Sequence, residues 1–186
     1  WSWSEAREIV LTSFNELSPE IAKIASKFFE NNWIDAEIRN GKDSGAYSHP
    51  CVPDVHPYIL MNYNGKSRDV MTLAHELGHG VHQVLASKNG YLLADTPLTL
   101  AETASVFGEM LVFQKLLSKA DSKQEKNSMI AEKVEDMLNT VIRQIAFHNF
   151  ETSFHNKRKS NEITPDEISE IWMETQSQAL GDAINL

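Results

Sequence analysis

Residues 70–82 read VMTLAHELGHGVH, a mostly apolar stretch that carries the pattern H-E-x-x-H at His75, Glu76 and His79. The spacing predicts a helix, in which residues four apart lie on one face. Both imidazoles can therefore reach one ion, and zinc accepts neutral imidazole nitrogens as ligands. Glu76 would lie beside the metal, where it can take a proton from an attacking water as general base, and Gly78 leaves room on the helix surface.

His82 lies on the same face of this helix as His75 and is a candidate for a further ligand. The separation of seven positions spans about 10.5 Å of helix axis, however, which is too far for one ion with bonds near 2 Å. The longer metzincin pattern also fails, because it requires Gly at position 82 and His at position 85, where Leu85 stands. The sequence therefore favours a role for His82 in packing or in supporting a ligand.

A second predicted helix, residues 97–117, supplies the third ligand. Its stretch from 98 to 113 is apolar on most sides, so we expect this helix to be buried. Glu102 and Glu109 are the only charged residues in that stretch, and they lie seven apart on one face. Because a buried carboxylate needs a partner, we predict Glu102 as the third ligand and Glu109 as the acceptor that orients a ligand histidine.

Two alternatives stay open in this set: Glu109 in a tertiary salt bridge, and Asp95, in the preceding loop, as a reserve ligand. Three protein ligands leave one position for water, as in catalytic zinc sites. Closed structural sites fill all four positions, usually with cysteines, and this chain has only Cys51. We therefore expect one Zn²⁺ per chain in an open site.

Turn residues and helical periodicity predict the remaining elements. Glycines and prolines cluster between positions 33 and 66, which indicates a small sheet or hairpin before the zinc helix. The predicted strand at 58–63 offers an edge that could align a peptide. The expected fold class is mainly α and zincin-like, with strands at 34–39, 46–48 and 58–63, and with helices at 3–16, from Ser18-Pro19 onward, at 69–87, 97–117 and 123–157, and after a capping box at Thr164–Glu167.

Length and composition set the remaining limits. The 186 residues suit one domain, and the net charge of −9 argues against sequence-independent nucleic-acid binding, which needs a basic face. A single cysteine excludes an internal disulfide and favours a reducing environment. No apolar run approaches the roughly 20 residues that span a membrane, and the first residues do not show the pattern of a basic segment followed by an apolar one that is typical of a signal peptide. The first residue, Trp1, leads us to expect a piece of a longer protein.

The chain resembles the oligoendopeptidase F family and, more distantly, thimet oligopeptidase. The zinc helix, Thr72–His82, is the most similar block, and together the blocks cover nearly the whole chain. The other matching blocks are Gly41–Tyr47, Pro57–Tyr63, Leu100–Ser105 with Glu109, and Arg143–Phe147 with Phe150-Glu151.

This resemblance implies a zinc endopeptidase of short peptides in the cytoplasm, with a mostly helical fold around a deep channel. By matched position it implies His75, His79 and Glu102 as ligands and Glu76 as the base. It also implies that residues 1–186 form a single partial catalytic domain, because members of the family are several times longer.

The chain departs from the family in what it lacks. The family carries an N-terminal lobe and a later segment, rich in His and Tyr, that binds substrate and stabilises the oxyanion; this chain ends at Leu186, before such a segment. The alternative prediction is therefore a zinc-binding fragment, or remnant domain, without activity of its own. Oligomeric state and cleavage preference do not follow from the sequence.

Overall fold

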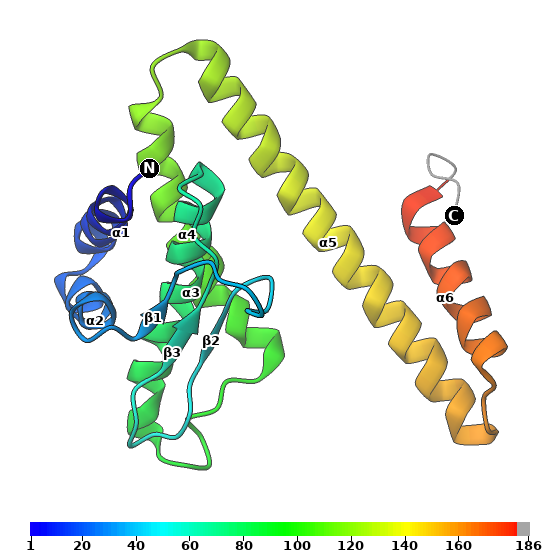
Figure 1. Ribbon diagram of the computed structural model, residues 1–186. Coiled ribbons are helices and arrows are strands. Elements are labelled where there is room, and N and C mark those ends of the chain that lie inside the picture. Colours follow the sequence, from blue (N-terminus) through cyan, green and yellow to red (C-terminus); the bar gives the residue numbers. More distant parts are fainter. Residues whose placement is uncertain (182–186) are drawn as a thin grey trace. The chain divides into compact units, whose positions relative to one another are not determined.

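The computed structural model describes residues 1–181, which divide into two compact units between Ala120 and Asp121 (Figure 1). Residues 182–186, the end of the predicted domain, lie outside the described residues. The assignment of the whole chain to one partial catalytic domain stays a prediction. Among residues 1–181, no helix combines the length and the apolar character needed to cross a membrane.

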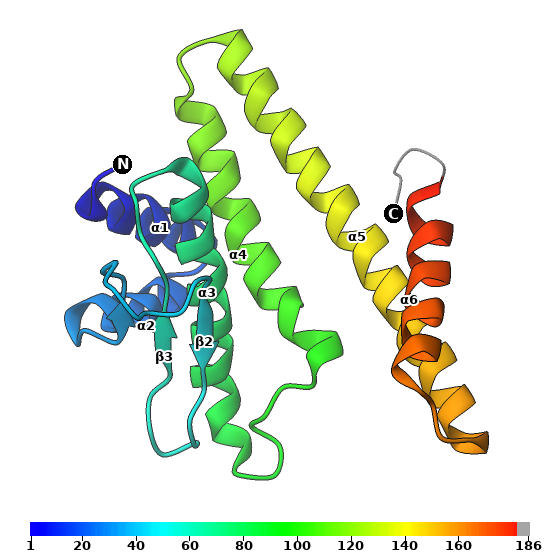
Figure 2. The same cartoon turned by 45° about the vertical axis from the view of Figure 1, so that its right-hand side comes forward.

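The first unit places its third helix between a small sheet and its fourth helix (Figure 2). The third helix also contacts both N-terminal helices, so it forms the centre of this unit. The elements are α1 (Trp3–Leu17), α2 (Pro19–Glu30), β1 (Ile34–Asp35), β2 (Tyr47–His49), β3 (Tyr58–Leu60), α3 (Ser67–Ala86), a 3₁₀ turn (Ser87–Asn89) and α4 (Leu98–Lys119).

The sheet has the strand order β1-β3-β2, with β1 parallel and β2 antiparallel to β3. Because β3 is the central strand, the idea that residues 58–63 align a peptide by edge pairing is wrong; β2 is the edge strand on that side. β1 and β3 are also shorter than predicted, whereas β2 has the predicted length and begins one residue later. Backbone hydrogen bonds nevertheless continue past them, from the Met61 N–H to Asp35 O and from the Tyr63 N–H to Ala36 O, each 3.0 Å.

A buried lysine holds the ends of these strands together. The side chain of Lys42 is 2% exposed, and its ammonium donates to the backbone oxygens of Asp35, Glu37 and Met61 at 2.9, 2.8 and 2.6 Å. It also contacts the Asp35 carboxylate at 3.0 Å, which accepts two further hydrogen bonds from Arg39, 2.7 and 2.6 Å long. Lys42 therefore fixes the loop between β1 and β2 to the sheet.

Helix α3 begins at Ser67, two residues before the predicted start, because Asp69 caps it. The Asp69 carboxylate accepts hydrogen bonds from the backbone N–H groups of Asn64 and Lys66, both 2.9 Å. Apolar side chains of α3 are buried with those of the neighbouring helices. The core comprises Val70, Met71, Leu73, Ala74, Leu77 and Val81 of α3, Ile9, Val10 and Phe14 of α1, Ile24 and Phe28 of α2, and Val112, Phe113 and Leu116 of α4.

The prediction that the helix carrying Glu102 is buried on most sides is wrong in this unit. Within residues 1–120, α4 packs against α3 and α1, which cover one face. On the other face, Leu100 and Phe107 are 57 and 51% exposed, and Leu98 in the first turn of the helix is 85% exposed. Helix α4 thus carries more apolar side chains than the first unit buries.

The second unit is a helical hairpin of α5 (Lys123–Ser160) and α6 (Pro165–Leu180). Trp172 of α6 packs on Phe147 and Phe150 of α5, with ring centroids 5.8 and 5.2 Å apart. The predicted capping box is present: the Thr164 hydroxyl accepts from the Glu167 N–H, and the Glu167 carboxylate accepts from the Thr164 N–H. The expected fold class, mainly α with a small sheet before the helix that carries the H-E-x-x-H motif, is confirmed.

Candidate metal centre

Helix α3 places His75 and His79 one turn apart on the same face. Their ring centroids are 4.9 Å apart and their planes are nearly perpendicular, at 83°. The two side chains are 25 and 16% exposed, so each imidazole is mostly enclosed while its edge stays accessible. The helix thus presents two nitrogen donors at the spacing that the sequence motif predicts.

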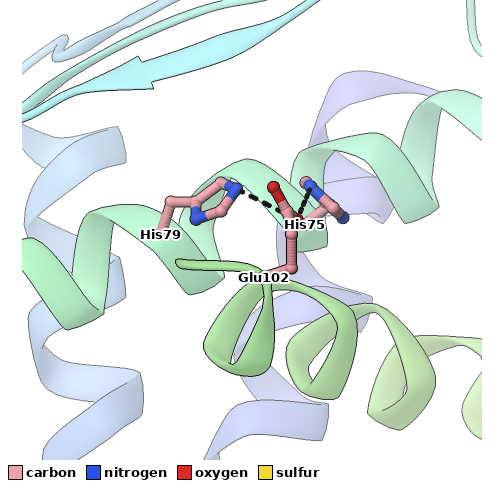
Figure 3. A group of neighbouring side chains, drawn as sticks. All are labelled: His75, His79 and Glu102. Carbon is pink, nitrogen blue, oxygen red and sulfur yellow. Dashed lines mark ion pairs between the residues drawn. The ribbon is translucent and has the colours of Figure 1, made fainter. Parts of the chain in front are cut away.

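Helix α4 brings Glu102 against this pair (Figure 3). Its Oε2 atom lies 3.2 Å from His75 Nε2 and 3.5 Å from His79 Nε2, and the three donor atoms lie within 4.8 Å of one another. A tetrahedral zinc ion with bonds of about 2.1 Å sets neighbouring ligand atoms about 3.4 Å apart. The donor types and their spacing therefore fit a zinc site.

Glu109 does not belong to this donor group, but it contacts one of its members, His75. Its Oε2 atom is 3.2 Å from His75 Nδ1, the nitrogen on the opposite side of the ring from Glu102. A neutral His75 that donates from Nδ1 to this carboxylate keeps its Nε2 lone pair directed at the donor cluster. Burial opposes the charged imidazolium, but the Glu109 hydrogen bond and the charges of Glu76, Glu102 and Glu109 outweigh it and raise the pKa of His75.

His79 has the opposite electrostatic balance. Burial lowers its pKa, and the positive charges of His75 and His82 add to this effect, although Glu102 and a hydrogen bond to the backbone of Ala101 oppose it. A lowered pKa favours the neutral imidazole, which is the form that binds a metal.

Glu76 is buried beside the donor cluster and is not a member of it. Burial, together with the negative charge of Glu102, raises the pKa of Glu76 to about 7, against the opposing effects of His75 and a hydrogen bond with the backbone of Ser48. Its Oε2 atom has no hydrogen-bond partner within residues 1–181. A buried carboxylate oxygen in this condition needs a polar partner such as water.

The remaining candidates do not join the donor group. In the part of the chain that the structure describes, only one group of three or more His, Cys, Asp or Glu side chains has metal-binding spacing. It consists of His75, His79 and Glu102. His82 does not belong to this group, and a positive charge on it would lower the pKa of His79. Asp95, the reserve ligand, lines a separate cavity of about 560 Å³ with Tyr91.

Two residues near the centre were missed by the sequence reasoning. The Ser105 hydroxyl donates to Glu102 Oε2 at 2.7 Å, and its position three residues after Glu102 on a helix is a signal that could have identified it. Ser48 of β2 lies beside α3: its hydroxyl donates to Gln83 Oε1 at 2.8 Å, and its carbonyl accepts from Gln83 Nε2 at 3.2 Å. No spacing in the sequence links Ser48 to the motif.

Known proteins resemble this chain along nearly its whole length. Oligopeptidase PepF of Bacillus subtilis (strain 168) is 30% identical over 185 residues, which cover 98% of this chain and 28% of that protein. Oligoendopeptidase F, chromosomal, of Lactococcus lactis subsp. cremoris is 33% identical over 160 residues, covering 86% of this chain and 26% of that protein. This chain therefore spans about a quarter of the length of these relatives.

A solved structure of PZ peptidase A with inhibitor 2 has the same fold, with a TM-score of 0.76 at 22% identity, over 97% of this chain and 31% of that one. The family described as Peptidase family M3 matches residues 13–186. These findings confirm the resemblance to oligoendopeptidase F. The chain belongs to peptidase family M3.

Proposed function

We propose that this chain is the zinc-binding catalytic core of a metalloendopeptidase that cleaves oligopeptides. The observation that carries the proposal is the convergence of His75 Nε2, His79 Nε2 and Glu102 Oε2 within 4.8 Å, with the buried carboxylate of Glu76 alongside. Membership of peptidase family M3 and the names of the relatives support the same reaction. The proposed setting is the cytoplasm, in keeping with the family resemblance and the single cysteine.

The proposed roles follow from the chemistry of each side chain. A zinc ion held by His75, His79 and Glu102 would polarise the scissile carbonyl and acidify the attacking water. Glu76 takes the proton of that water and passes it to the leaving amine, a task suited to a carboxyl with a pKa near 7. Glu109 keeps His75 in the correct orientation through Nδ1.

Strand β2 is the proposed guide for the substrate. It is the edge strand next to α3, and the backbone of Ser48 in this strand lies beside Glu76. A peptide that runs along this edge would bring its scissile bond to the donor cluster.

A second candidate is a zinc-binding fragment without independent activity. It is favoured by the length of the chain, which covers 28% of PepF and 26% of the lactococcal oligoendopeptidase F. Groups that stabilise the oxyanion would then have to come from another segment.

The first test is the zinc content of the purified chain, with His79→Ala and Glu102→Ala for comparison. We expect about one zinc per chain in the unchanged protein and a loss or strong weakening in both variants. A chain that binds no zinc after reconstitution would refute the metal centre.

The second test separates the two candidates with a peptide-cleavage assay on the zinc-loaded chain and on Glu76→Gln. If the chain is an active peptidase, turnover should fall about 10²- to 10⁴-fold in Glu76→Gln while zinc content is kept, because the base is lost and the ligands remain. Retained turnover would remove Glu76 from the role of base. Zinc binding without turnover in the unchanged chain would favour the inactive fragment.

A further inference from the structure

Helices α3 and α4 touch through backbone atoms next to the donor cluster. A Cβ atom added to Gly78 would lie 2.6 Å from the carbonyl oxygen of Ala104 and 2.7 Å from Cα of Ser105. Real Cβ atoms essentially never lie within 3.0 Å of a heavy atom from another part of the chain. Because both obstacles are backbone, no change of rotamer can relieve the overlap, and α4 would have to move as a whole.

This contact lies where the ligands meet. Gly78 lies between His75 and His79 in sequence, and Ser105 is the residue whose hydroxyl holds Glu102 Oε2 at 2.7 Å. Glycine is a poorer helix former than alanine, so its presence in the middle of α3 calls for a reason in the packing. The close approach of α4 supplies that reason.

We propose that Gly78 is a positioning residue that sets the separation of α3 and α4, and that it tunes zinc affinity mainly through Glu102, while Glu109 on the same helix contributes through His75. The inference rests on the proposed metal centre and adds to it a residue that donates nothing to the ion. A methyl group at position 78 would push Glu102 away from the two histidines, which stay together because both belong to α3.

The fold indicates which helix would move. α3 contacts α1, α2, β2, β3 and α4, whereas α4 contacts α3 and α1 within this unit. A displacement of α4 therefore disturbs fewer contacts. The Glu102 ligand, on the helix with fewer contacts, is the one that depends on the glycine.

Two other glycines serve for comparison, because a Cβ added to either of them would meet different neighbours. A Cβ at Gly108 of α4 would lie 3.1 Å from the carbonyl oxygen of Ala74 and from Cζ of Phe14, a milder approach at the same helix pair. A Cβ at Gly80 would lie 2.6 Å from Cζ of Phe28, a side chain of α2. Gly80→Ala thus strains α3 against α2 and serves as the matched control.

The experiment measures the zinc Kd, by competition with a chromophoric chelator, for the unchanged chain, Gly78→Ala, Glu102→Ala and the double variant. We expect Gly78→Ala to weaken binding about tenfold. In the Glu102→Ala background, the same glycine substitution should weaken binding clearly less, by about threefold, because only the displacement of Glu109 then still acts on the centre. Gly80→Ala should keep the Kd of the unchanged chain even where its melting temperature falls.

Three results would overturn the inference. The first is an unchanged zinc Kd in folded Gly78→Ala, and the second is a loss that adds in full to that of Glu102→Ala. If Gly78→Ala does not fold, Gly108→Ala takes its place, with an expected loss that is again smaller in the Glu102→Ala background; an unchanged Kd is the third result. An unchanged chain that binds no zinc would instead refute the metal centre itself, and the inference with it.

Discussion

Helices α3 and α4 supply the two halves of the proposed metal centre, but the fold holds them to different degrees. α3 packs against the sheet and three helices, and its two histidines are 25 and 16% exposed. Within residues 1–120, α4 packs against α3 and α1 with one face, and the Glu102 side chain is 56% exposed. The comparison teaches that the histidine pair is fixed by the core, whereas the carboxylate depends on one helix contact and on Ser105.

The difference between the two helices is tested most strongly by removing one proposed ligand from each, His79 from α3 and Glu102 from α4. Structural zinc binds with about 10–16 kcal/mol from four ligands, or roughly 3 kcal/mol for each, which is about 100- to 1,000-fold in Kd. We expect a loss of this size in His79→Ala. Glu102→Ala should lose less, about 10- to 100-fold, because water can replace an exposed carboxylate on a loosely held helix.

The measurement is the zinc Kd at fixed pH and ionic strength, with circular dichroism as the check on folding. Equal losses in the two variants would show that the two halves are equally organised. A larger loss in Glu102→Ala would reverse the comparison.

The second way acts across the two helices. Glu109 belongs to α4 but holds His75 of α3 through Nδ1, at 3.2 Å. Glu109→Gln keeps the size of the side chain and weakens the acceptor, so we expect zinc affinity to fall about tenfold, and by no more than 100-fold. Removal of the carboxylate should also lower the pKa of the zinc-free His75, which an NMR titration of the imidazole can follow. An unchanged titration would show that Glu109 does not act on this ring.

The third and smallest effect concerns the sheet that flanks α3. Arg39 and Lys42 hold the pKa of the Asp35 carboxyl well below its usual value, mainly through the hydrogen bond from Arg39 and against the effect of burial. A depressed pKa contributes stability that is present above about pH 4 and is lost as the pH falls through that value and below it. Because the Asp35 side chain is 37% exposed, we expect a contribution of only about 1 kcal/mol.

Urea denaturation of the unchanged chain and of Asp35→Asn at several pH values between 7 and 2 checks this expectation. The difference in unfolding free energy should be largest near neutral pH and should shrink as the pH falls. The zinc Kd at neutral pH should stay the same, since Asp35 lies outside the donor cluster. A difference that does not vary with pH would show that the carboxylate charge is not what stabilises the sheet.

The helices and the motif were accessible from the sequence because they depend on local spacing. Periodic apolar residues and the capping box at Thr164 predicted helix positions to within a few residues, and the four-residue spacing of His75 and His79 predicted that they share a face. Strand lengths and pairing were less accessible, since the central position of β3 depends on partners distant in the chain.

Glu102 lies near the two histidines, as its predicted role as third ligand requires, but the premise of that prediction was wrong. The argument relied on a helix buried on most sides, yet α4 exposes a full face within its unit. What brings Glu102 Oε2 within 3.5 Å of both imidazoles is the backbone contact at Gly78, which no charge pattern reveals.

The sequence by itself determined the elements, the motif and the chemistry of the donors, because residues three and four apart in a helix are neighbours whatever the rest of the chain does. Only the tertiary structure decided how close α4 comes to α3, which strand lies beside Glu76, and which nitrogen of His75 faces Glu109. Those distances arise from packing between segments far apart in the chain, and packing is set by the shape of both surfaces at once.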